Sequence, residues 1–147
     1  TSFTGDAEPI ASNLEEADDP PGFGVLGASM TESSGLFTFP ATGYWHIFFR
    51  HDFYGDTNVF EFETQAWIKV TVDDGTYEGA SHGVSSSGQK SGEKVRGSAS
   101  TDFIFDVTDV ANCKVRFDAL CEIASTTTMG ASNVHQTGFT FLRLADT

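Results

Sequence analysis

Few residues in this chain have the types and spacing that catalysis requires. The nearest pair to a nucleophile and its base is Ser81-His82, but adjacent residues of a strand point to opposite faces. No Gly-x-Ser-x-Gly turn is present, and such a turn is what exposes the serine of many hydrolases. We therefore predict that the chain is not an enzyme and has no catalytic residues.

The two cysteines, Cys113 and Cys121, lie eight residues apart in one alternating apolar segment. On a single strand this spacing separates them by about 26 Å, whereas a disulfide requires Cα atoms within about 7 Å. We expect two free thiols that act as small core residues. Two free thiols do not indicate whether the protein resides in a reducing or an oxidising compartment.

The four histidines show no spacing typical of metal ligands; they are His46, His51, His82 and His135. His46 is better explained as a histidine hydrogen-bonded at a subunit interface than as a ligand of a metal or an anion. Asp73-Asp74-Gly75 has the start of a calcium loop without its later Glu, and is better explained as a turn. No cofactor is predicted, and calcium stays open without an identified site.

Composition indicates one globular, β-rich domain. The 147 residues are 39% hydrophobic and include 14 Phe and 15 Gly, which favours strands joined by tight turns. A net charge of −13 repels polyanions, so no nucleic-acid partner is expected. No run of 18 apolar residues exists, so no membrane insertion is expected. Because the chain starts at Thr1 without Met or a signal peptide, it is interpreted as a processed product or a piece of a longer polypeptide.

Residues 1–34 are predicted to form an acidic N-terminal arm, distinct from a domain over 35–147. The arm carries seven carboxylates and no Lys or Arg. Ser12 to Ala17 could form a short helix, with Ser12 as the N-cap and Glu15 at the capping-box position. Asp19-Pro20-Pro21-Gly22 would end it.

From Gly35 onward the pattern is that of strands. Residues 44–53 are apolar on both faces, and residues 60–73 alternate, with Phe60 and Phe62 assigned to the apolar face and Glu61 to the polar one. Trp67 is the exception on that polar face, which marks it as a partner contact. Residues 85–100 are interpreted as a mobile loop or weak edge strand; they hold three of the eight basic residues, Lys90, Lys94 and Arg96.

Two further alternating strands are predicted over 103–107 and 113–121. The last segment, 138–144, is apolar on both faces. We predict that it lies in the middle of a sheet, with one face on the core and one on a neighbouring subunit.

These segments resemble the globular head of complement component 1q and the tumour necrosis factor superfamily over about residues 34–145. Ser34 to Trp45 resembles that family's G-x-F-x-x-P-x-x-G-x-Y entry into its central strand. Thr137 to Leu142 is similar to its last strand, while Ala111-Asn112 replaces the usual Gly-Asp turn. The resemblance implies an all-β, two-sheet antiparallel jelly-roll sandwich with a short N-terminal arm. The stretch Gly27 to Gly43, after an acidic arm, looks closest to marine bacteriophage structural proteins.

Such folds are usually trimers with aromatic residues at the three-fold axis. Carried over by position, the axis residues would be His46, Phe48, Phe139 and Phe141. The leading hypothesis is a viral (bacteriophage) structural protein of the virion, a trimeric tail-fibre or receptor-binding module that binds a host surface glycan or receptor. One alternative is a capsid decoration protein that contacts other virion proteins. Another is a secreted lectin-like or cytokine-like ligand-binding protein.

Overall fold

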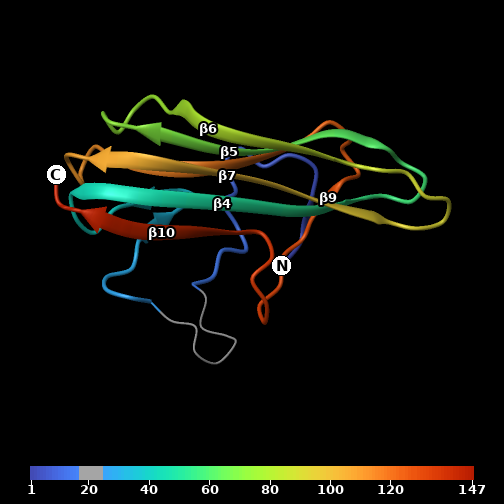
Figure 1. Ribbon diagram of the computed structural model, residues 1–147, viewed down its shortest axis with the longest axis horizontal. Coiled ribbons are helices and arrows are strands. Elements are labelled where there is room, and N and C mark those ends of the chain that lie inside the picture. Colours follow the sequence, from blue (N-terminus) through green and yellow to red (C-terminus); the bar gives the residue numbers. More distant parts are fainter. Residues whose placement is uncertain (17–24) are drawn as a thin grey trace.

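The computed structural model describes residues 1–16 and 25–147, and these form two five-stranded antiparallel sheets packed face to face (Figure 1). Sheet A consists of β1 (Phe3–Thr4), β9 (Thr127–Thr128), β4 (Gly43–Gly55), β10 (Gly138–Ala145) and β7 (Val95–Val107). Sheet B consists of β2 (Thr31–Ser33), β3 (Leu36–Thr38), β8 (Lys114–Cys121), β5 (Glu61–Thr71) and β6 (Glu78–Ser87). The all-β jelly-roll sandwich predicted from the sequence is confirmed.

The core lies between the sheets and is built from alternating residues of the two central strands. Ile47 and Phe49 of β4 are fully buried, as are Val115 and Phe117 of β8. The Phe49 and Phe117 rings meet at 5.3 Å between centroids. The two apolar faces bury each other, which is the main stabilisation of a sandwich.

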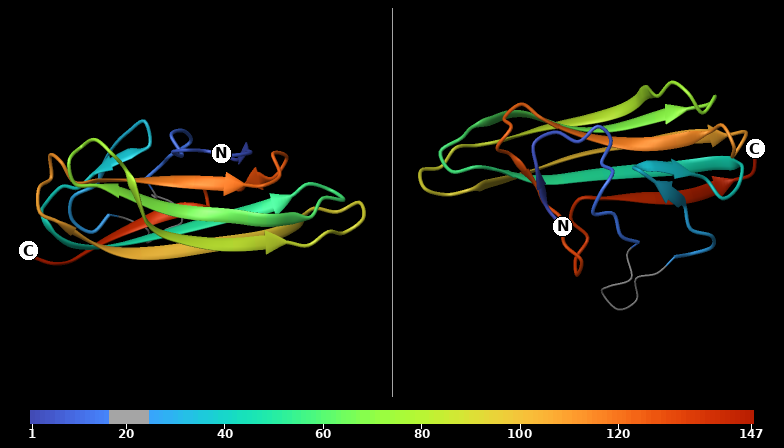
Figure 2. Two further views of the ribbon diagram at one scale, coloured as in Figure 1. Left: turned by 90° about the horizontal axis from the view of Figure 1, so that it is seen from above. Right: turned by 180° about the vertical axis from the view of Figure 1, so that it is seen from behind.

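The N-terminal segment packs against the sandwich and continues sheet B along β8. Ala7 pairs with Ala119, Ile10 N–H donates to the Phe117 carbonyl, and Ile10 is buried. Figure 2 shows this segment beside β8 in the view from behind. It therefore supplies hydrogen-bond partners to β8 beyond the short β3 strand.

The short helix predicted from Ser12 is not formed by the described residues up to Glu16. Asn13 adopts a φ of 61°, which is left-handed and breaks a right-handed helical turn. Ala17 and the predicted stop at Asp19 to Gly22 lie outside the described residues. The boundary at residue 34 stays a prediction. In the described part of the chain, no helix is long and apolar enough to span a membrane.

β10 lies at an edge of sheet A, so its predicted place in the middle of a sheet is wrong. Among the described residues its only strand partner is β4. Apolar faces do not determine whether a strand is paired, because the hydrogen-bonding edges of a strand lie perpendicular to its side-chain faces.

Residues 85–100, interpreted above as a mobile loop or weak edge strand, are mostly the ends of two long strands. β6 runs to Ser87 and β7 begins at Val95, so the loop between them is short. At the right-hand end of Figure 1 this hairpin lies next to the β4–β5 loop. Asn58 links the two loops: its carbonyl accepts from Gln89 Nε2 at 2.6 Å and its Oδ1 from Gly92 N–H at 3.1 Å.

β6 of sheet B also approaches β7 of sheet A closely, and Gly83 makes this approach geometrically feasible. A Cβ atom at this position would lie 2.0 Å from the Ser100 carbonyl oxygen. Any larger residue would force the two strands apart.

Candidate functional site

The outer face of sheet A carries apolar side chains from three adjacent strands. His46 of β4 lies directly between Ile104 of β7 and Leu142 of β10 in the strand register. Ile104 is 56% exposed and Leu142 is 50% exposed. Tyr44 and half-buried Phe48 extend the same face along β4. We call these five residues the sheet A outer face.

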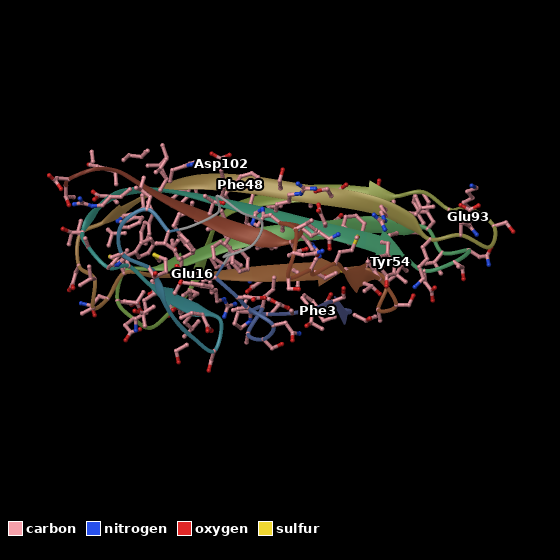
Figure 3. All side chains as sticks on the ribbon, turned by 90° about the horizontal axis from the view of Figure 1, so that it is seen from below. Phe3, Glu16, Phe48, Tyr54, Glu93 and Asp102 are labelled. Atoms are coloured by element: carbon pink, nitrogen blue, oxygen red, sulfur yellow. The ribbon has the colours of Figure 1, made fainter. Side chains whose placement is uncertain are left out.

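The polar groups beside this face already have partners within the chain. His46 Nε2 lies 3.1 Å from Asp102 Oδ2, and Arg50 Nη2 lies 2.7 Å from Asp52 Oδ2. Figure 3 shows Phe48 and Asp102 side by side, as their direct pairing requires. Tyr44, Ile104 and Leu142 remain exposed beside these paired groups, and exposed apolar side chains gathered on one face indicate an interaction surface.

Two of the four residues predicted for a trimer axis do not lie on this face. Phe139 and Phe141 pair with Phe49 and Ile47, so they point into the sandwich. The Phe139 ring stacks on Phe117 at 3.8 Å. Their assignment to the axis is wrong, because a strand that is apolar on both faces does not reveal its inner face without its register. His46 and Phe48 point outward as predicted; their place at an axis stays a prediction.

Sheet B presents a different outer face, in which charged side chains pair across strands. The carboxylate of Asp118 is fully buried and accepts from Lys69 Nζ at 2.7 Å and from Arg116 Nη2 at 3.1 Å. Lys114 Nζ forms an ion pair with Asp74. The charges of this half of the face, formed by Lys69, Lys114, Arg116 and Asp118, are therefore paired within the chain, although Asp118 Oδ1 and Arg116 Nε are buried without a hydrogen-bond partner among the described residues.

Trp67 lies on the same outer face, as the alternation of β5 predicted. It is half-buried, its ring stacks on His82 at 4.2 Å, and its Nε1 donates to Gln65 Oε1. Since His82 remains exposed, the stacked pair forms an aromatic surface accessible to a partner. A contact with a partner stays a prediction.

The other half of the sheet B outer face was not predicted, because a bulge reverses the expected alternation. The β5 register shifts between Glu61 and Thr64. Glu61 is fully buried, where it accepts hydrogen bonds from Glu122 N–H, Ile123 N–H and the Thr126 hydroxyl. Phe62 is 64% exposed and contacts Phe60 at 4.5 Å between ring centroids. The assignment of Phe60 and Phe62 to the core side was wrong.

The residues considered for chemistry are held apart or buried. Ser81 hydrogen-bonds to Thr101 at 2.6 Å, while its neighbour His82 stacks on Trp67 on the opposite face. Both cysteines are buried free thiols. Burial, with Glu61 and Asp6 nearby, raises the pKa of Cys121 to about 12, so this thiol stays protonated and unreactive.

The described residues contain no group of three or more His, Cys, Asp or Glu placed to hold a metal ion. At Asp73-Asp74-Gly75, Asp73 Oδ1 accepts from the Thr71 hydroxyl at 2.7 Å and from Gly75 N–H at 2.9 Å. This hydrogen bonding is that of a turn. Calcium binding stays an open prediction.

Together, the two sheets define an antiparallel jelly-roll sandwich. The solved structure of murine APRIL at pH 5.0 is similar to it, with a TM-score of 0.52 and 12% identity over 81% of this chain and 80% of that chain. At this identity the likeness shows the fold alone. No protein-family model and no curated protein sequence matches the chain.

Proposed function

We propose that this chain is a non-catalytic ligand-binding module that acts as a homotrimer, with the sheet A outer face buried between copies. The observation that carries the proposal is the row formed by Ile104, His46 and Leu142 across three strands. Two of these side chains are half exposed or more in the single chain. Burial against another copy removes this apolar area from water, at roughly 25 cal/mol per Å².

A closed homo-oligomer accounts for this face better than an open one. In a cyclic assembly each copy buries the same patches, and no apolar surface is left at an end. The jelly-roll resemblance implies three copies rather than two. The pairing of His46 with Asp102 and of Arg50 with Asp52 keeps the neighbouring polar groups satisfied when water is excluded.

The sheet B outer face would remain free in such a trimer and would bind the ligand. Its stacked Trp67–His82 pair and exposed Phe62 are the kind of aromatic surface that is enriched at binding sites. Among the functions predicted from the sequence, the fold likeness supports the secreted cytokine-like or lectin-like alternative. The bacteriophage tail-fibre and capsid-decoration hypotheses rest on the sequence pattern of residues 27–43 alone.

The oligomeric state of the purified chain tests the proposal. Light scattering after size-exclusion chromatography should give three times the chain mass of 15.8 kDa at micromolar concentration. A stable monomer under these conditions would contradict the proposal, and a mass twice that of the chain would refute the three-fold arrangement.

A further inference from the structure

The outer face of sheet B has a hollow lined by two carboxylates that have no cation partner within the described residues, and one of them, Glu63, follows Phe62 in the chain. The hollow has a volume of about 300 Å³ and is lined by Glu63, Gln65, Leu120, Cys121 and Glu122. Exposed Val84 lies opposite Gln65 on the neighbouring strand. We call Phe60, Phe62, Glu63, Val84, Leu120 and Glu122 the Phe62 patch.

The carboxylates of this patch have no cation of their own. Among the described residues, no hydrogen bond or ion pair reaches the Glu122 carboxylate, and Glu63 accepts only from Gln65 Nε2. Lys69 is engaged by Asp118 at 2.7 Å and Glu8 at 3.5 Å. The other half of the same face therefore neutralises its charges, whereas the Phe62 patch leaves its acceptors unmatched.

We propose that the Phe62 patch binds a basic segment of a partner protein, with an Arg or Lys side chain in the hollow. This inference rests on the proposed function, in which sheet B is the ligand-binding face. The cationic head would bind the Glu63 and Glu122 carboxylates, its aliphatic stem would pack on Leu120, and the exposed ring of Phe62 would contact the same side chain by a cation–π interaction.

Charge complementarity favours this partner over the other classes. The chain has 21 acidic and 8 basic residues, and such a field accelerates the approach of a basic partner and repels an acidic one. A neutral glycan would stack on the aromatic rings and donate hydroxyl hydrogen bonds to the two carboxylates, but it would leave their charge without a counter-ion, which an Arg or Lys side chain supplies.

The test measures fluorescence polarisation of a labelled peptide of alternating Arg and Gly against the full chain. Glu63→Gln/Glu122→Gln should weaken binding about tenfold. Glu15→Gln/Glu93→Gln is the matched control, since it removes the same charge at exposed positions elsewhere and should change affinity less than about twofold. Equal losses in the two double variants would show that only net charge matters and would overturn the proposal.

A second pair of variants tests the aromatic part of the patch. Phe62→Ser should weaken peptide binding about fivefold, whereas Val72→Ser, at a position of similar exposure (66% against 64%), should leave it unchanged. Equal effects of these two substitutions would overturn the proposal. It would also be overturned by wild-type affinity weaker than about 1 mM, or by an uncharged glycan whose binding is lost with Phe62→Ser and retained in Glu63→Gln/Glu122→Gln.

Measuring the mass of the same samples separates the two proposals. If the chain is a monomer and the two double variants still differ in peptide affinity, the trimer is refuted and the Phe62 patch remains a binding site. If the chain is a trimer and the two double variants bind the peptide equally, only the peptide site is refuted.

Discussion

On the outer face of sheet B, Lys69 and Arg116 neutralise the buried carboxylate of Asp118, whereas on the outer face of sheet A, Ile104 and Leu142 lie exposed on either side of His46. Both sheets share one core, so the core does not explain the difference. The half of the sheet B face around Asp118 pairs its charges within the chain and is suited to water, whereas the Phe62 patch on the same face has two carboxylates without a cation partner in the described part of the chain. An apolar face whose few polar groups are already paired is suited to contact with another copy. We therefore infer that the two faces serve different partners.

Two adjacent residues of β10 give the largest expected contrast. Phe141 packs on Phe37 and Phe117, so Phe141→Ala should lower the free energy of unfolding by about 3 kcal/mol. Leu142 is 50% exposed in the single chain, so Leu142→Ala should instead weaken the assembly. Urea unfolding at two protein concentrations separates the effects, because only assembly makes the midpoint depend on concentration. If the loss of stability depended on protein concentration for Phe141→Ala and not for Leu142→Ala, Phe141 would lie on the outer side of β10 and Leu142 on the inner side.

The interior between the two faces should be sensitive to acid through His51. Burial lowers the pKa of His51 to about 4 from its usual 6.5, against a smaller opposing effect of Asp52. Because the unfolded chain binds this proton more readily, stability should fall as the pH drops from about 6.5 to about 4, by roughly 3 kcal/mol in total. Urea unfolding of the wild type and His51→Gln across this range isolates the histidine, since the carboxylates titrate in both. Parallel pH profiles would contradict the assignment.

The buried ion pairs of Asp118 on sheet B should contribute more to the free energy of unfolding than the exposed pair of Asp102 and His46 on sheet A. Asp118→Asn removes a fully buried charge that faces Lys69 and Arg116, and should cost about 2 kcal/mol. Asp102→Asn is the control: its side chain is 64% exposed beside His46, and the loss should be under about 0.5 kcal/mol. Denaturant titration measures both. Equal losses of unfolding free energy in the two variants would mean that Asp118 is no better neutralised by its partners than Asp102 is by His46.

The smallest effect is expected at Trp67. Its stack on His82 lies on the outer face of sheet B, so Trp67→Ala should cost under about 1 kcal/mol of stability and leave the assembly intact. Thermal unfolding together with light scattering checks both expectations. Dissociation of the trimer by this substitution would mean that the assembly and ligand faces have been exchanged.

The sequence predicted the two-sheet fold and most of its strands, but not the register in which the strands pair. Alternation along β4 placed Phe48 and Phe49 on opposite faces, and the family resemblance assigned Phe48 to the outer one. β10 is apolar on both sides, and only its pairing with β4 shows that Phe139 and Phe141 face inward. The bulge after Glu61 depends on β6 and on hydrogen bonds from residues 122–126, which no local pattern in residues 60–63 encodes.

The Phe62 patch could have been suspected from one local signal. Two Phe residues alternate with two Glu residues at 60–63, and no Lys or Arg occurs between Asp52 and Trp67. The alternation alone assigned Phe60 and Phe62 to the core face of the strand, which is wrong. Only the partners of Glu61 show that Phe62 and Glu63 are both exposed.

Sedimentation velocity of two charged variants tests whether the sheet A outer face holds the copies of the chain together. Ile104→Asp places a carboxylate on the sheet A outer face beside His46, while Val72→Asp places one at a site of comparable exposure beyond the end of β5 (56% and 66% exposed). We expect Ile104→Asp to sediment as a folded monomer and Val72→Asp to remain a trimer like the wild type. A trimeric Ile104→Asp, or a Val72→Asp that dissociates, would contradict the assignment of sheet A as the assembly face.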